Sequence, residues 1–140
     1  MALDQARKEW EDNTESAPKK VTQGTYKKWT VVQPFRRFGE ALAWLDWNDD
    51  IIEIKKLETL NPGIGGPTKL LKFLQSIADK HGLRISAWIV AYSPDQPALE
   101  GKLRTQKGLE EWYRRRGFQI ERNPCGGAFG WYPTAAKDAE

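Results

Sequence analysis

Residues 57–71 read L-E-T-L-N-P-G-I-G-G-P-T-K-L-L, and this stretch joins a strand-like apolar run to a helix-like one through three glycines and two prolines. The apolar residues after the glycines fall at the spacing of one helical face: Leu70, Leu71, Leu74, Ile77 and Ala78. A helix N-terminus presents unpaired N–H groups and a partial positive charge, which suit phosphate. The stretch therefore predicts a phosphate-binding turn. A glycine loop that only turns a corner is the alternative.

The segments around this turn predict an α/β (α+β) fold. Residues 41–47 and 51–57 are strand-like runs separated by Asn-Asp-Asp, which is the pattern of a hairpin. Further elements are expected at 29–32 and 84–92 as strands, about 68–81 and 105–116 as helices, and 118–122 and 128–132 as strands, with a loop at 93–101. Strand, glycine turn, helix and strand then form one β-α-β unit in a mixed, mostly antiparallel sheet flanked by helices.

The glycine pattern narrows the choice of phosphate ligand. It matches neither G-x-x-x-x-G-K-[ST] nor G-x-G-x-x-G, so a P-loop nucleotidase and a Rossmann fold both lose support. The stretch resembles the GNAT acyltransferase superfamily, in which a strand ends near V-x-P, passes through R-G-x-G-x-G and enters a helix at x-x-L-L. Aligned without a gap, residues 57–59 take the V-x-P place, Gly63 and Gly65 take the first two glycines, and residues 70–71 take the leucines.

The resemblance implies that the turn binds the pyrophosphate of coenzyme A, with acetyl-CoA as the acyl donor. The expected binding residues are Leu57 and Thr59 on the strand and the backbone amides of Gly63, Ile64, Gly65, Gly66 and Thr68. Two residues depart from the family pattern, Pro62 in place of Gln or Arg and Pro67 in place of Gly or Ala. Pro67 lacks an N–H and removes one phosphate donor, but its fixed φ suits the first helical turn.

A second match follows at residues 106–118, which read Q-K-G-L-E-E-W-Y-R-R-R-G-F. The family's last motif resembles N-x-x-A-x-x-L-Y-x-x-x-G-F, so Tyr113, Gly117 and Phe118 match in place. The resemblance implies that Tyr113 contacts the coenzyme and protonates its departing thiolate, which suits a group with a reference pKa of about 10. It also implies a coenzyme contact by Gln106, in place of the usual Asn. A core aromatic at position 113 is the alternative. The arginines at 114–116 are interpreted as a solvated helix end, with contact to the coenzyme's 3'-phosphate or to an acidic partner as the alternative.

The family reaction is direct transfer, here of an acetyl group to a primary amine of a small molecule or a protein. Glu58 is the preferred general base, because it lies near the point where the resemblance places a gap between two strands. The odd separation of Glu53 and Glu58 along one strand predicts that only one of them faces the acceptor. His81, about 18 Å along the helix from the turn, and the lone Cys125 are weaker candidates.

Length and composition favour one compact domain. The chain has 140 residues, 39% of them hydrophobic and 29% charged, which suits a domain at 25–133 with a tail at 134–140. Residues 1–24 are polar with a weak helical pattern, so we expect a loosely attached segment.

Composition also excludes several classes of protein. One Cys and one His cannot form an internal disulfide or a zinc cluster, and no metal is expected. No run approaches about 20 apolar residues and the first residues lack a signal-peptide core, so we expect a cytoplasmic protein with no membrane partner. A net charge of +3 permits an anionic ligand without requiring nucleic acid. The seven tryptophans are expected mainly in the core or in pocket walls.

Two other functions stay open at this stage. One is a catalytically inactive GNAT-like module that binds a protein partner, since small stand-alone members found in bacteriophages look similar and could act on a host target. Whether the chain is an enzyme at all therefore stays open, as do the acceptor and a homodimer. The other is a Trp-rich RNA-binding domain, but the chain lacks an RNP-like or GXXG motif, so a nucleic-acid partner is not expected.

Overall fold

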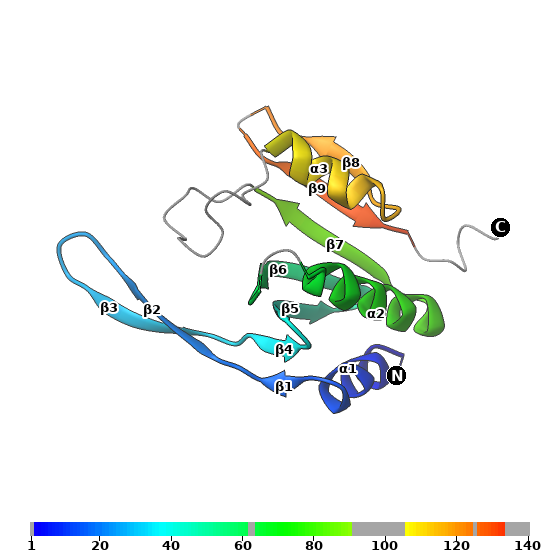
Figure 1. Cartoon of the computed structure of the whole chain (residues 1–140), viewed down its shortest axis with the longest axis horizontal. Coiled ribbons are helices and arrows are strands. Elements are labelled where there is room, and N and C mark those ends of the chain that lie inside the picture. Colours follow the sequence, from blue (N-terminus) through cyan, green and yellow to red (C-terminus); the bar gives the residue numbers. More distant parts are fainter. Residues whose placement is uncertain (1, 62–63, 91–105, 125, 134–140) are drawn as a thin grey trace.

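The computed structural model describes residues 2–61, 64–90, 106–124 and 126–133, and they form one large sheet, a separate hairpin and three helices (Figure 1). The large sheet has seven strands in the order β1-β4-β5-β6-β7-β9-β8. The helices are α1 (Ala2–Asp12), α2 (Gly66–His81) and α3 (Gln106–Arg114). The strands are β1 (Glu15–Ser16), β2 (Lys19–Gln23), β3 (Trp29–Gln33), β4 (Arg36–Phe38), β5 (Ala41–Asn48), β6 (Ile51–Thr59), β7 (Arg84–Ile89), β8 (Gln119–Arg122) and β9 (Ala128–Tyr132).

The sheet is mixed and mostly antiparallel, as predicted, because β6 and β7 are its one parallel pair among the described strands. The β5–β6 hairpin, helix α2 and strand β9 lie where the sequence predicts them. Helix α2 ends at the predicted stop, since Gly82 takes the left-handed conformation with φ 69° and ψ 37°. Helix α3 is shorter than predicted. The predicted loop at 93–101 and tail at 134–140 lie outside the described residues.

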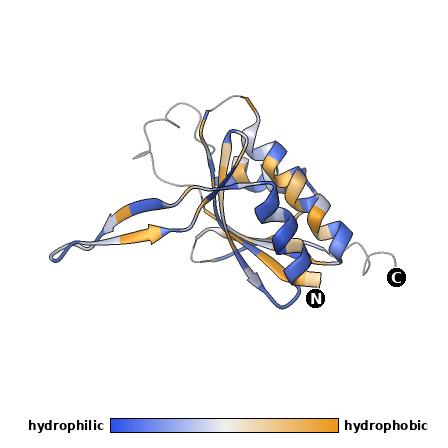
Figure 2. Cartoon of the chain, turned by 90° about the horizontal axis from the view of Figure 1, so that it is seen from below, coloured by the Kyte–Doolittle hydropathy of each residue, from blue (hydrophilic) through white to orange (hydrophobic). Residues whose placement is uncertain are grey.

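All three helices lie on one face of the sheet, as Figure 2 shows. Ile54 pairs with Ala87 across β6 and β7, and Ile89 pairs with Ala128 across β7 and β9, so these buried residues share one face. They form a single core cluster with the buried residues of the helices. Among the described residues, no helix has the length and apolar character needed to span a membrane.

Helix α1 is part of this core, which corrects the expected loose attachment for residues 2–12 of the segment 1–24, whereas β2 lies outside the large sheet. Ala6 and Trp10 are 0% and 1% exposed, and the Trp10 ring stacks on Phe73 of α2 at 6.0 Å between centroids. The stripe of apolar residues on α1 is narrow. The helix is nevertheless packed against α2, because the tryptophan buries far more area than an average apolar side chain.

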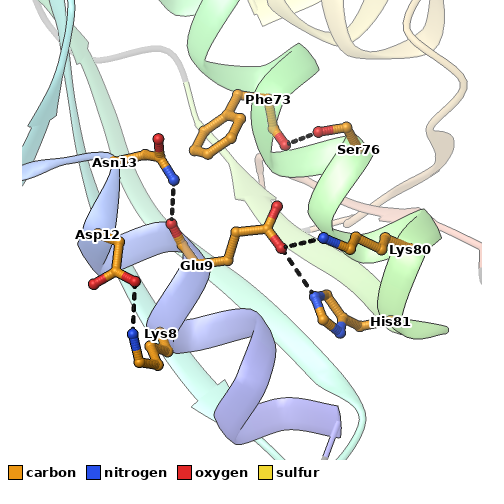
Figure 3. Close-up of polar contacts among 8 residues, drawn as sticks. All are labelled: Lys8, Glu9, Asp12, Asn13, Phe73, Ser76, Lys80 and His81. Carbon is orange, nitrogen blue, oxygen red and sulfur yellow. Dashed lines mark hydrogen bonds and ion pairs between the residues drawn. The ribbon is translucent and has the colours of Figure 1, made fainter.

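A polar contact also joins α1 to α2 (Figure 3). Glu9 Oε1 lies 3.0 Å from Lys80 Nζ and 3.2 Å from His81 Nε2. The hydrogen bonds from Lys80 and then His81 hold the pKa of Glu9 below its usual 4.5. His81 therefore serves helix packing at the end of α2 that is remote from the glycine turn.

This contact gives a pH-dependent stability. A depressed carboxyl pKa stabilises the fold at pH values above the ordinary pKa, and that contribution is lost as the pH falls through the folded-state pKa. We expect Glu9→Gln to lower the melting temperature by about 1–3 °C at pH 7 and by much less near pH 3, since such partly exposed pairs contribute about 0.2–1 kcal/mol. Thermal melts at both pH values test this, with the exposed Glu15→Gln as control. Equal melting temperatures of Glu9→Gln and the unmodified protein at pH 7 would contradict it.

Strand β6 carries a β-bulge in its pairing with β5. Trp44 lies opposite Lys56 while the next residue, Leu45, lies opposite Ile54, so Lys55 is an extra residue on β6. A bulge bends a strand and increases its twist. The bend therefore lies at Lys55, four residues before β6 ends at Thr59.

The bulge corrects the expected placement of the two glutamates on β6. Glu53 lies opposite Asp46 and Glu58 lies opposite Leu42 on β5. Asp46 and Leu42 are an even number of residues apart and share one face, so Glu53 and Glu58 share that face too. The prediction that only one of them can face the acceptor is therefore wrong. Lys56 lies on the same face as these glutamates.

Candidate functional site

Strands β6 and β7 pair over only part of their length. Their parallel register runs from Ile51 opposite Arg84 to Ile54 opposite Ala87. Beyond this point β6 continues to Thr59 with only β5 as its partner, and β7 continues to Ile89 with β9. The last paired residue of β6 directly precedes the bulge, so the two strands separate where β6 bends. The gap between strands that the resemblance implies is therefore found at this point.

The glycine turn follows the end of β6 that has separated from β7, and α2 begins at this turn. Gly65 is the N-cap residue with φ 75° and ψ 24°, and a Cβ placed on it would meet no atom of the described residues beyond its chain neighbours within 4 Å. Gly66 has a different reason to be glycine, because a Cβ there would lie 2.6 Å from the carbonyl oxygen of Glu40. Gly65 thus leaves open space beside the helix terminus, whereas Gly66 allows the turn to pack on the sheet. The predicted residue Gly63 lies outside the described residues.

The first turn of α2 presents unused backbone donors. Within the described chain, the backbone N–H groups of Gly66 and Thr68 make no backbone hydrogen bond, and the first such bond runs from Lys69 N to Gly65 O at 3.1 Å. Gly65 supplies no side-chain cap. Pro67 occupies the first turn, where its missing N–H was expected to be tolerated. Ile64, just before the turn, is 48% exposed.

A small hollow of about 110 Å³ adjoins the turn, and Lys69 lies in its wall with Phe38 and Gly66. Lys69 lies in the first turn of α2, two residues after Pro67, and its side chain is exposed. It adds a cation beside the terminus.

Arg116 brings a further cation to this turn. Its Nη2 donates to Thr68 Oγ1 at 3.0 Å and its Nη1 donates to the Trp112 carbonyl at 2.7 Å. The guanidinium lies over the Trp112 ring at 4.1 Å from its centroid. Arg114 and Arg115 are exposed, as expected for a solvated helix end, but Arg116 is only partly exposed. The sequence could not single it out, although its position four residues after Trp112 is consistent with stacking on that ring.

Tyr113 and Gln106 both lie on α3. Tyr113 is 5% exposed and packs edge-on against Trp112 and Phe118, at 5.0 and 5.1 Å between centroids. The Gln106 side chain donates to the Ile89 carbonyl and to Glu110 Oε2, each at 2.9 Å. Tyr113 is therefore a core aromatic in its surroundings, and its contact with the coenzyme, like that of Gln106, stays a prediction.

A buried carboxylate on α3 has no counterpart in the sequence predictions. The Glu110 side chain is 3% exposed, and its Oε1 lies 3.1 Å from Arg122 Nη2 on β8. Burial alone would raise the Glu110 pKa, but hydrogen bonds from Gln106 and Arg122, together with the charges of Arg122 and Arg114, lower it. This carboxylate fixes α3 on the sheet and so sets the position of Tyr113. An i, i+4 relation to Gln106 was the only signal in the sequence.

Glu58 lies on the face of the sheet opposite the helices. Its side chain is 12% exposed and its Oε1 accepts a 2.8 Å hydrogen bond from Lys19 Nζ on β2. Leu57 and Thr59, its neighbours on β6, lie opposite Ala43 and Ala41 and therefore share the helix-covered face. The predicted base and the predicted coenzyme-contacting residues thus lie on opposite faces, with the gap between β6 and β7 beside both.

Comparison with known proteins decides the fold. No protein family model and no curated protein matches the chain. The crystal structure of the anti-CRISPR protein AcrVA5 matches with a TM-score of 0.52 and 19% identity, over 69% of this chain and 93% of that chain. The fold is GNAT-like. Nourseothricin acetyltransferase matches more weakly, with a TM-score of 0.44 and 11% identity over 86% of each chain.

Within this GNAT-like fold the structure brings together only part of the predicted site. Gly65, Gly66 and Thr68 meet at one helix terminus, and Arg116 joins them from the turn that follows α3. Tyr113 lies in the core under α3, and Glu58 lies across the sheet.

Proposed function

We propose that this protein is an acetyl-CoA-dependent N-acyltransferase that transfers an acetyl group to a primary amine. The observation that carries the proposal is the separation of β6 from β7 directly before a glycine turn that begins α2. A gap in a parallel strand pair frees backbone groups for an extended ligand, and the helix terminus beside it suits that ligand's phosphates. The GNAT-like fold and the likeness to the AcrVA5 structure support the same function.

The residues at the turn fit a pyrophosphate. Gly65 leaves room for an oxygen atom where a side chain would stand, and the amides of Gly66 and Thr68 are available as donors. The Arg116 guanidinium, 3.0 Å from Thr68 Oγ1, supplies the charge-assisted donors that phosphate favours. Together they replace the donor that Pro67 removes.

The chemistry assigned to the chain is direct transfer. The acceptor nitrogen forms a bond to the thioester carbonyl carbon while the carbon–sulfur bond breaks. Glu58 takes the proton released by the amine and Tyr113 donates its hydroxyl proton to the departing thiolate. The nitrogen and the sulfur are bonded to the same carbon in the transition state, so this assignment requires Glu58 and Tyr113 to act on one reacting centre in the gap from opposite faces of the sheet. Lys19 must release Glu58 or share it through water during the reaction.

A matched pair of variants at Gly65 tests the binding site. Asn and Asp both tolerate the left-handed conformation and both cap helices, so Gly65→Asn and Gly65→Asp should fold alike and differ by one negative charge. Calorimetric titration with acetyl-CoA is expected to show micromolar binding to the unmodified protein, and at least about tenfold weaker binding to Gly65→Asp than to Gly65→Asn, because of charge repulsion. If the folded unmodified protein binds no acetyl-CoA, or if the two variants bind equally, the proposal fails.

A further inference from the structure

Residues 17–34 form a hairpin arm that stands apart from the large sheet. They read A-P-K-K-V-T-Q-G-T-Y-K-K-W-T-V-V-Q-P and contain β2 and β3, which pair with each other from Lys19–Gln33 to Gln23–Trp29. Neither strand belongs to the seven-stranded sheet. Figures 1 and 2 both show this hairpin projecting away from the helix-covered body. Most side chains of these two strands are exposed to solvent rather than packed on the rest of the chain. The arm is therefore accessible to a binding partner.

The arm is a positively charged segment without any acidic residue. The arm contains four lysines and no acidic residue, so it carries +4 while the whole chain carries +3 and the remainder −1. Lys19 at the base is paired with Glu58. Lys20, Lys27 and Lys28 are exposed and have no carboxylate partner within the described chain. The arm therefore presents three exposed lysines that attract a polyanion.

Aromatic side chains lie among these lysines at the tip. Tyr26 is fully exposed and Trp29 is 53% exposed. The Trp29 ring packs over the backbone of Gly24, where a Cβ would lie 2.5 Å from a ring carbon. This packing holds the ring against the turn while about half of the side chain stays exposed. Exposed aromatic faces between cations are the arrangement by which proteins stack unpaired bases and hold their phosphates.

We propose that the arm binds single-stranded nucleic acid, with lysines on the phosphates and Tyr26 and Trp29 stacked on bases. An acidic protein surface would satisfy the lysines but offers no row of planar groups for the two aromatic side chains. The remaining exposed side chains near the tip, Thr22, Gln23, Thr25 and Thr30, are polar and hydrogen-bonding. The arm lies outside the glycine turn and α3, so this binding does not depend on the proposed transferase activity.

Fluorescence anisotropy with labelled single-stranded DNA and RNA of about 20 nucleotides tests the proposal on the full chain at about 50 mM salt. We expect binding whose affinity falls with salt with a logarithmic slope of about −2, which corresponds to three phosphate contacts at about −0.7 each. The triple variant Lys20→Gln, Lys27→Gln, Lys28→Gln is expected to abolish binding. A matched variant on the body, Lys55→Gln, Lys72→Gln, Lys107→Gln, removes the same charge and is expected to retain it.

The aromatic contribution is measured separately. Tyr26→Ala, a change at a fully exposed side chain, is expected to weaken binding roughly 5- to 100-fold without changing the melting temperature. The proposal is overturned if no strand binds at low salt, if both triple variants weaken binding equally, or if Tyr26→Ala binds as the unmodified protein does. Equal competition by polyglutamate of matched charge would also overturn it, in favour of an acidic protein partner.

Discussion

Replacing Tyr113 by phenylalanine is expected to lower the rate of acetyl transfer by about 10²- to 10⁴-fold, because the change removes the one proton assigned to the leaving thiolate. The ring stays in place, packed between Trp112 and Phe118, so the affinity for acetyl-CoA should change less than about threefold. The rate is measured as thiol release, with the best acceptor from a panel of primary amines and lysine peptides. Acetyl-CoA affinity is measured by calorimetry.

Tyr132→Phe provides the matched control. It removes a phenol hydroxyl that donates to Asp79 on α2 at 2.9 Å and has no assigned role in the transfer. This variant should keep the unmodified rate. If Tyr113→Phe also keeps that rate and loses only thermal stability, then Tyr113 is a core aromatic and the assignment of the acid is wrong.

Replacing Trp10 by alanine is expected to lower the free energy of unfolding by about 3–5 kcal/mol. Trp10 is 1% exposed, contacts Phe73 and lies in the same core cluster as the sheet residues, so its loss leaves a cavity between α1 and α2. A domain of this kind has about 5–15 kcal/mol of stability in total, so the variant should be close to unfolding at 37 °C.

Urea unfolding followed by circular dichroism measures this loss. Gln5→Ala, on an exposed position of the same helix, should change the free energy of unfolding by less than about 0.5 kcal/mol. A loss below about 1 kcal/mol for Trp10→Ala would mean that α1 adds little to the stability of the fold.

The sequence predicts the central part of the fold because several independent signals agree there. The apolar positions of α2 fall on one face, glycines flank it at both ends, and strand-like runs lie on either side. Strands β1, β2 and β4 were missed because they are short or polar, and such strands carry no alternation that distinguishes them from loops. Helix α1 was assigned correctly in pattern but not in attachment, since one tryptophan supplies most of its buried contact.

In the candidate site, too, local features could be predicted from the sequence, whereas contacts between distant segments could not. Glycine at 65 follows from backbone geometry and could be predicted. The reason for glycine at 66 is the Glu40 carbonyl, which occupies the place of a Cβ, and this is a contact between distant segments. The bulge at Lys55 depends on the register with β5, so counting residues placed Glu58 on the wrong face relative to Glu53. Arg116 is one of three consecutive arginines, and only the fold shows which of them reaches Thr68.

The strand order also constrains how the chain can fold during synthesis. Strand β9 lies between β7 and β8, although it follows both in the sequence. Neither β8 nor the outer edge of β7 has its partner until residues 128–132 have left the ribosome. Until then the nascent chain exposes a strand edge with unpaired backbone groups, which can pair with other chains and aggregate. The pairing of β9 therefore determines when this risk of aggregation ends.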